Sequence, residues 1–224
     1  MANLCYNKVV VTGASKELID FTNKFGENGI TAFLPTPKEL NERKAPFAGT
    51  EEEEKRLASK YGAADWYNWR LKNWGTKWDV DIFSADLGCF EFTTPWSPPI
   101  EAFTKISEMY PKLIFNMVYS ESGMGFLGKA VFEGGTVDDQ TFDWDSRFEE
   151  GVWPITIQVI DLESTLDDLL EFLDEDFQSK YSDCIQKYVS EDLKWNEEKD
   201  EIRKLFEALN DEDEDYIKSI CKNR

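Results

Sequence analysis

The sequence predicts an α+β fold, in which an antiparallel sheet carries two helices and an acidic helical region follows. Three observations predict it. Apolar runs with strand and helix periodicity occur in the order strand, helix, strand, strand, helix, strand, which is the split βαβ, or ferredoxin-like, arrangement. A proline-interrupted stretch separates the first helix from the second strand. After residue 160 the apolar positions recur at helical spacing.

The first strand and helix follow from the N-terminal segment. Residues 7–12 read NKVVVT, a β-branched run that Gly13 ends, and such a run favours a buried strand. Ser15 can cap a helix over the apolar positions that follow. Gly26 and Gly29 stop this helix.

An insertion after the first helix is expected at about residues 31–79. It begins with FLPTPKELNERKAPFAGT, whose prolines are typical of irregular structure. Thr50 and Glu53 form a capping-box pattern for a short helix over residues 51–61. Four tryptophans then fall within the short segment WYNWRLKNWGTKW.

The second half of the sheet is predicted by alternating and β-branched runs, and its helix by TPWSPP followed by apolar positions on one face. The expected strands are residues 80–85, 88–93, 113–119 and 126–132, with a last strand at 153–160 that extends the sheet. The chain thus divides into an α+β domain, 1–160, and an acidic helical C-terminal region, 161–224.

The charge of the chain restricts its partners. It has 45 acidic and 25 basic side chains and a net charge of −20. Residues 161–224 contain more than twice as many acidic as basic side chains. Such a surface repels phosphate backbones and attracts basic proteins, so we expect no direct nucleic-acid binding. A homo-oligomer is left open.

Histidine is absent, which excludes Ser-His-Asp and Cys-His catalysis and histidine-ligated zinc. No cofactor or metal is predicted. The four cysteines, Cys5, Cys89, Cys184 and Cys221, are scattered without a CxxC pair, and we expect reduced thiols. No secretory signal or bilayer-length apolar run is present, so a cytoplasmic protein without a membrane partner is expected.

Four segments resemble landmarks of one family: the N-terminal NLCYNKVVVTG, NWGTKWD at 73–79, FTTPWSPP at 92–99 and YSESGMGFLG at 119–128. Together they are similar to the YubB-type ferredoxin-like family of phage and plasmid proteins, over about residues 1–132. The resemblance implies the ferredoxin-like fold and a mobile-element origin, but no reaction. Leu4 departs from the tryptophan usual in relatives.

Aromatic, lysine and carboxylate side chains occur in three loop-like segments that this fold can gather at one end of the sheet. Aromatic faces with a few polar groups can bind a nucleotide or a sugar. The alternative, which we prefer for the tryptophans, is that they fill the space between insertion and sheet. The candidate ligand-binding residues are Trp74, Lys77, Trp78, Trp96, Glu121, Met124 and Phe126.

Two further patterns have simple structural explanations. Asp79 and Asp81 lie two residues apart on one strand, as a magnesium site or an acid–base pair requires. In so acidic a chain a solvated hairpin is the preferred interpretation. The segment SGMGFLG lacks the spacing of a phosphate-binding loop, and Gly123 and Gly125 fit a tight turn instead.

The favoured hypothesis is a non-enzymatic phage- or plasmid-type accessory protein. It would bind and inhibit a basic host protein, such as a nucleic-acid-binding defence factor, through an acidic surface. Its role would be counter-defence or anti-CRISPR-like, with nucleic-acid mimicry as one means of binding. The alternative is a small-ligand binding protein or enzyme that uses the aromatic cluster. The expected acidic partner-binding face consists of Asp167, Asp168, Glu171, Asp174, Glu175, Asp176, Asp211, Glu212, Asp213, Glu214 and Asp215.

Overall fold

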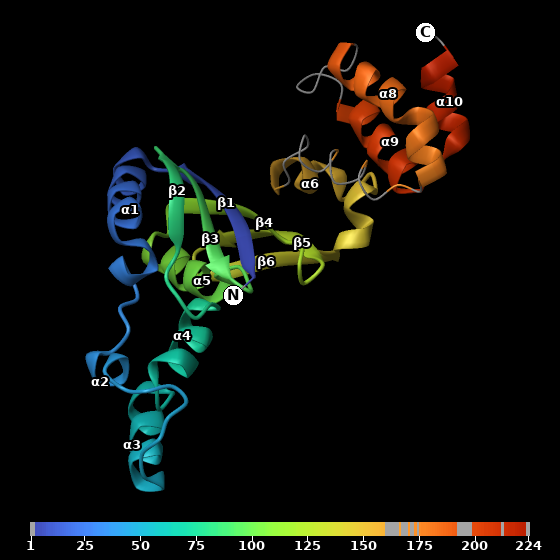
Figure 1. Cartoon of the computed structure of the whole chain (residues 1–224). Coiled ribbons are helices and arrows are strands. Elements are labelled where there is room, and N and C mark those ends of the chain that lie inside the picture. Colours follow the sequence, from blue (N-terminus) through green and yellow to red (C-terminus); the bar gives the residue numbers. More distant parts are fainter. Residues whose placement is uncertain are drawn as a thin grey trace. The chain divides into compact units, whose positions relative to one another are not determined.

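The computed structural model describes residues 3–159, 166, 170, 173, 175–191, 199–211 and 213–222. Two compact units make up the chain, Met1–Trp144 and Asp145–Arg224 (Figure 1). The sequence had placed the boundary after residue 160. It falls earlier because Phe148 and Trp153 pack in the apolar core of the C-terminal unit.

The N-terminal unit is built on a six-stranded antiparallel sheet in the order β2-β3-β1-β4-β5-β6. The order β2-β3-β1-β4 is that of the ferredoxin-like split βαβ fold, which confirms the predicted fold class. β5 and β6 extend the sheet beyond β4. The strands are β1 Leu4–Gly13, β2 Asp81–Asp86, β3 Cys89–Pro95, β4 Leu113–Glu121, β5 Phe126–Glu133 and β6 Thr136–Asp143.

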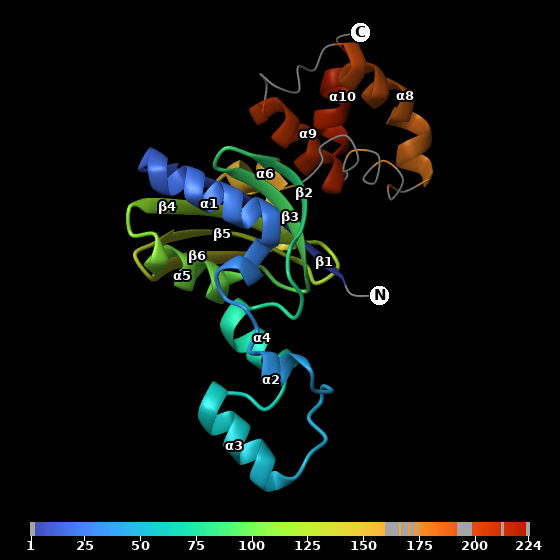
Figure 2. The same ribbon diagram turned by 90° about the vertical axis from the view of Figure 1, so that its left-hand side faces the viewer.

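Two helices, α1 (Ser15–Asn28) and α5 (Ile100–Met109), pack on the sheet, as Figure 2 shows for α1. Their phenylalanines interlock with those of the strands, and the ring centroids of Phe21 and Phe115 lie 5.0 Å apart, edge to face. Such edge-to-face aromatic packing stabilises a core beyond the area that it buries. α1 begins at Ser15 itself, so the predicted cap by Ser15 is wrong: Ala14 precedes the helix and makes no side-chain cap.

The insertion contains η1 (Gly29–Ala32), α2 (Lys38–Asn41), α3 (Glu51–Tyr61) and α4 (Trp66–Trp74). The hydroxyl of Thr50 accepts a hydrogen bond from the Glu53 N–H, which confirms the predicted cap of α3. Leu40, Leu57 and Ala64 form a small core between these helices.

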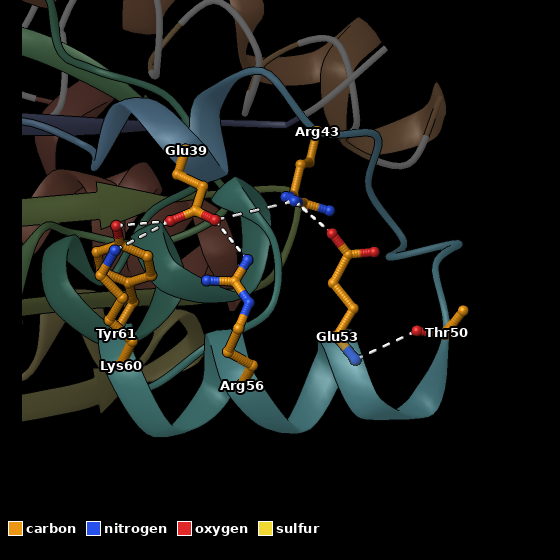
Figure 3. Close-up of polar contacts among 7 residues, drawn as sticks. All are labelled: Glu39, Arg43, Thr50, Glu53, Arg56, Lys60 and Tyr61. Carbon is orange, nitrogen blue, oxygen red and sulfur yellow. Dashed lines mark hydrogen bonds and ion pairs between the residues drawn. The ribbon is translucent and has the colours of Figure 1, made fainter.

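Polar contacts join α2 to α3 (Figure 3). The Glu39 carboxylate accepts hydrogen bonds from Arg56, Lys60 and Tyr61, at 3.2 Å for Lys60 and 2.9 Å for the Tyr61 hydroxyl. Arg43, which follows α2, pairs with Glu53 of α3 at 2.6 Å. Charge-assisted bonds therefore add to the apolar packing that holds the insertion together.

The two edges of the sheet differ. β2 has a register shift between Ile82 and Ser84 where it pairs with β3. β6 pairs with β5 in unbroken register, and seven of its eight residues are exposed, with Phe142 half-buried. In the described part of the chain β6 is bonded to no strand other than β5, so its outer backbone groups face outward.

The described helices of the C-terminal unit are α6 (Trp153–Val159), α8 (Glu175–Glu191), α9 (Lys199–Asn210) and α10 (Glu214–Lys222), after a short 3₁₀ turn, η2 (Trp144–Phe148). They share an apolar core around Ile185, Leu205 and Phe206. The helical character predicted for this region holds for the described elements.

The strand predicted at 153–160 is wrong, because residues 153–159 form α6. The β-branched run WPITIQVI favours a strand by propensity, but Trp153, Thr156 and Val159 are buried at helical spacing. Pro154 falls in the first helical turn, where its missing N–H costs no hydrogen bond. Packing thus overrides the local preference.

A disulfide joins Cys184 of α8 to Cys221 of α10, with the two Cα atoms 6.0 Å apart. The expectation that all four thiols are reduced is therefore wrong for this pair. The sequence gave no sign of it, because the two cysteines lie 37 residues apart and meet only when the apolar faces of α8 and α10 pack together. Cys5 and Cys89 are free thiols.

Candidate functional site

The expected aromatic cluster is split between the core and the surface. Trp74 is fully buried in the main core, and its indole N–H donates to the Leu34 carbonyl at 2.9 Å. Phe126 is half-buried and packs against the same core. Trp96 and Met124 are 42% and 58% exposed and lie in separate loops.

Glu121, at the end of β4, is 3% exposed. One of its carboxylate oxygens accepts a hydrogen bond from the Gly123 N–H at 3.0 Å, and this bond closes the turn predicted for the glycine segment. Burial and the nearby Glu121 charge raise the pKa of the Cys5 thiol well above its ordinary value. Cys5 is therefore a protonated core thiol at neutral pH rather than a nucleophile.

A cavity of about 340 Å³, here called the sheet-end cavity, opens between α5, β4, β5 and β6. Glu101 and Asp139 contribute carboxylates, Thr141 a hydroxyl, and Tyr119 and Phe126 rings. The Tyr119 hydroxyl donates to Asp139 Oδ1 at 2.6 Å and lies 2.8 Å from Thr141 Oγ1. Burial, and next the hydrogen bond to Asp139, raise the pKa of Tyr119.

A second cavity, of about 400 Å³ and here called the aromatic pocket, lies in the insertion and the loop before β2. It brings together Lys77 and Trp78, which the sequence had singled out, with the Lys77 Nζ 4.1 Å from the Trp78 ring centroid. Its other walls are Ala45, Pro46, Trp66, Tyr67 and Asn68.

The sequence analysis missed Trp66 and Tyr67 as site residues. Asp65 caps α4 and thereby places both rings in the first helical turn, beside the loop around Pro46. An aspartate directly before the aromatic run, a residue type that commonly caps helix N-termini, was a usable signal for this helix start.

Three residues of the predicted acidic face, Asp211, Asp213 and Glu214, make contacts within the C-terminal unit. Asp213 Oδ1 accepts hydrogen bonds from the backbone N–H groups of Asp215 and Tyr216, which caps α10. Glu214 pairs with Lys218 and, at 3.7 Å, with Lys180. Asp211 accepts a hydrogen bond from Asn210 at 3.2 Å. Asp167, Asp168, Glu171, Asp174 and Glu212 lie outside the described residues, as do the side chains of Glu175 and Asp176.

Asp79 has a structural role. Its carboxylate accepts hydrogen bonds from the backbone N–H groups of Ile30 at 2.8 Å and Thr31 at 3.0 Å, and from the Thr31 hydroxyl. These bonds tie η1 to the loop before β2. Among the described residues, no group of three or more cysteine, aspartate or glutamate side chains is arranged to hold a metal ion.

Comparison with known proteins gives one family match. Residues 73–162 match a model described as the ferredoxin-like domain in Api92-like protein, which spans β2 to α6 and agrees with the observed topology. The chain is also similar to the crystal structure of protein api92 from Yersinia pseudotuberculosis, with 9% identity, a TM-score of 0.36, and coverage of 63% of this chain and 98% of that one. No curated protein matches. None of the described helices has the length and apolarity to span a bilayer.

Proposed function

We propose that this chain is a non-enzymatic binding protein that captures a basic, extended segment of a host protein as an added strand beside β6. The observation that carries the proposal is the character of β6, an exposed and regular sheet edge that bears carboxylates. An unpaired edge offers backbone N–H and C=O groups in the spacing that an extended peptide needs.

The side chains of β6 give the edge its charge preference. Asp138 and Asp139 are adjacent, so their carboxylates lie on opposite faces of the sheet. An added strand with lysine or arginine at successive positions would meet a carboxylate on each face. The same charges oppose the pairing of β6 with β6 of a second copy, because like charges on adjacent strands are destabilising.

The sheet-end cavity supplies an anchoring point on the face of Asp139. A basic side chain of the added strand would point toward Asp139 and Glu101 and pack against the Phe126 ring. Neither lysine nor arginine lines this cavity among the described residues. Lys105, one turn further along α5, interacts electrostatically with Glu101 and partly offsets the negative charge of the sheet-end cavity.

The wider charge of the chain supports the same proposal. A net charge of −20 steers basic proteins toward the chain and makes their association salt-dependent. Because Asp213 and Glu214 are engaged in capping and pairing, we assign the capture to β6 rather than to the described helical acids. We further propose a phage or plasmid origin of the YubB type and counter-defence action in the host cytoplasm. A cytoplasmic location makes the Cys184–Cys221 disulfide an exception to the reduced thiols that are usual in that compartment.

The test uses an eight-residue peptide in which pairs of adjacent lysines alternate with pairs of valines, so that lysines occur on both faces of the added strand. Its binding is followed by amide hydrogen exchange and NMR shifts. The amides of β6 should gain protection, and Asp138→Lys should weaken binding about tenfold, with a larger loss for Asp138→Lys/Asp139→Lys. The matched control is Asp183→Lys/Asp200→Lys, which makes the same charge change on exposed residues of α8 and α9. Equal loss in both double variants, or protection confined to the helices, would refute the assignment to β6.

Pull-down from host lysate at low and high salt then identifies the natural partner.

A further inference from the structure

The aromatic pocket carries an inference that is independent of the capture at β6. Its rings come from two segments, with Trp66 and Tyr67 at the start of α4 and Trp78 in the loop before β2. Trp78 is 49% exposed and Tyr67 is 37% exposed. Trp74 belongs to the main core and Trp69 packs against it, whereas the rings of Trp78 and Tyr67 are accessible to a ligand.

The walls of the pocket are held in place from behind. The buried Asp65 carboxylate accepts hydrogen bonds from the Asn68 N–H and side-chain amide, both at 2.9 Å, and from the Phe47 N–H at 3.2 Å. One side chain thus fixes both the start of α4 and the loop that contains Pro46. A wall that is already ordered binds a ligand without the entropic cost of ordering it.

Arg70 holds two further parts of the wall, the Trp66 ring and the backbone of Lys77. Its guanidinium lies 5.1 Å from the Trp66 ring centroid and donates to Thr36 Oγ1 at 2.9 Å, to Asn41 Oδ1 at 3.1 Å and to the Lys77 carbonyl at 3.4 Å. The Trp66 ring and the backbone of Lys77 are therefore tied to the same cation.

The electrostatic character of the pocket is opposite to that of the chain. Lys77 contributes an ammonium group, Asn68 an amide, and no carboxylate lines the pocket. Among the described carboxylates none forms an ion pair with Lys77, although the chain has a large excess of acidic side chains. Behind the walls, the Arg70 guanidinium interacts electrostatically with Asp79, and the Asp65 carboxylate holds Asn68, so Lys77 is the charged group that the pocket presents.

We infer that the aromatic pocket binds a free nucleotide, with the base on the ring faces of Trp78 and Trp66 and the phosphate at Lys77. Aromatic faces bind the flat rings of bases by stacking, and an ammonium group pairs with a phosphate. The volume of about 400 Å³ lies within the roughly 300–1,000 Å³ of small-molecule sites. A mononucleotide suits this chain better than a nucleic-acid strand, because a strand would bring many phosphates against a net charge of −20.

Isothermal titration calorimetry with adenosine 5′-monophosphate, adenosine and ribose 5-phosphate separates the contribution of base stacking from that of phosphate pairing with Lys77. We expect the nucleotide to bind more tightly than either part. Lys77→Gln should weaken the nucleotide about tenfold and leave adenosine unchanged, and Trp78→Ala should weaken both about tenfold. Trp96→Ala is the matched control, since it removes a similarly exposed ring outside the pocket and should change neither.

Three results would overturn the inference: equal affinities for nucleotide and adenosine, wild-type affinity in Lys77→Gln, or no heat of binding at millimolar nucleotide. Tighter binding of an eight-residue oligoadenylate would overturn the assignment to a free nucleotide. Lys77→Gln keeps the aromatic walls, so it tests the site even if Trp78→Ala fails to fold. Charge reversal at Asp138 should leave the affinity for the nucleotide unchanged, which separates this test from that of the capture at β6.

Discussion

The ring of Tyr119 on β4 lies directly over the backbone of Gly128, its partner on β5. A Cβ atom on Gly128 would lie 2.4 Å from both the Cζ atom and the hydroxyl oxygen of this tyrosine. The missing side chain lets the phenol cross β5 and reach Asp139 and Thr141 on β6. One glycine thus decides how the wall of the sheet-end cavity is built.

Gly128→Ala should lower the free energy of unfolding by about 1–3 kcal/mol, because the ring of Tyr119 must leave its place or the strands must separate. Urea denaturation monitored by circular dichroism measures the loss. Gly125→Ala is the comparison: nothing lies within 4 Å of its added Cβ, and only its positive φ of 76° opposes the change. A smaller loss is expected there, and a larger loss at Gly125 than at Gly128 would contradict the steric explanation.

Tyr119→Phe should alter the stability of the protein at high pH. Burial raises the pKa of this phenol above its ordinary value near 10, so the folded chain favours the protonated form. Its contribution is complete below the pKa of the unfolded chain and disappears as the pH rises through the higher folded value. At neutral pH the variant should be about 1 kcal/mol less stable than wild type, because it lacks the hydrogen bonds to Asp139 and Thr141. As the pH rises above 10, the stability of wild type should fall more than that of the variant. Unfolding curves at pH 7 and at pH 11 measure both effects, and parallel losses in the two proteins would contradict the prediction.

The contacts of Glu39 predict how the insertion responds to acid. Hydrogen bonds from Arg56, Tyr61 and Lys60 lower the pKa of Glu39 to about 2. A lowered carboxylate pKa stabilises the fold above the unfolded value near 4.5, and this contribution is lost as the pH falls toward 2. NMR signals of α2 and α3 should therefore change in this window.

Glu39→Gln should remove most of that acid dependence, since glutamine does not titrate. Glu52→Gln is the matched control, because Glu52 lies exposed in the first turn of α3, away from this cluster. If the acid response of wild type and Glu39→Gln coincided, another carboxylate would be responsible.

The disulfide predicts a thiol count and a stability difference. Unfolded under non-reducing conditions, the chain should expose two thiols to a thiol reagent, those of Cys5 and Cys89. Cys184→Ser/Cys221→Ser should lower the stability of the C-terminal unit by up to about 4 kcal/mol, the chain-entropy value for a loop of this length. Thermal unfolding followed by near-ultraviolet circular dichroism measures the difference. Four titratable thiols in the purified chain would contradict the bond.

The order of the first strands and helices could be predicted because each buries one face. Phe90 and Phe92 of β3 alternate with half-buried neighbours, and this alternation is visible in the sequence. In β1 the sequence shows a β-branched run, and the structure buries Val9 and Val11 while Val10 is exposed. β6 was missed for the opposite reason: its residues TVDDQTFD bury neither face, so no period of two marks them.

The site residues were predictable only in part. The sequence shows that Lys77 and Trp78 lie beside other aromatic residues, but not which rings are inside. That depends on the rotation of α4 about its axis, which its packing against α5 sets. The same rotation buries Trp74 and leaves Tyr67 exposed, although both are aromatic residues of one helix.

The irregular pairing of β2 has a consequence for stoichiometry. A sheet whose two edges were equally regular could accept a segment on each side, and such head-to-tail growth leads to open polymers. The slip between Ile82 and Ser84 makes β2 a poor template, while β6 remains regular. If β6 captures a segment as proposed, the sheet formed by the described residues accepts one added strand, and the complex stops growing after that addition.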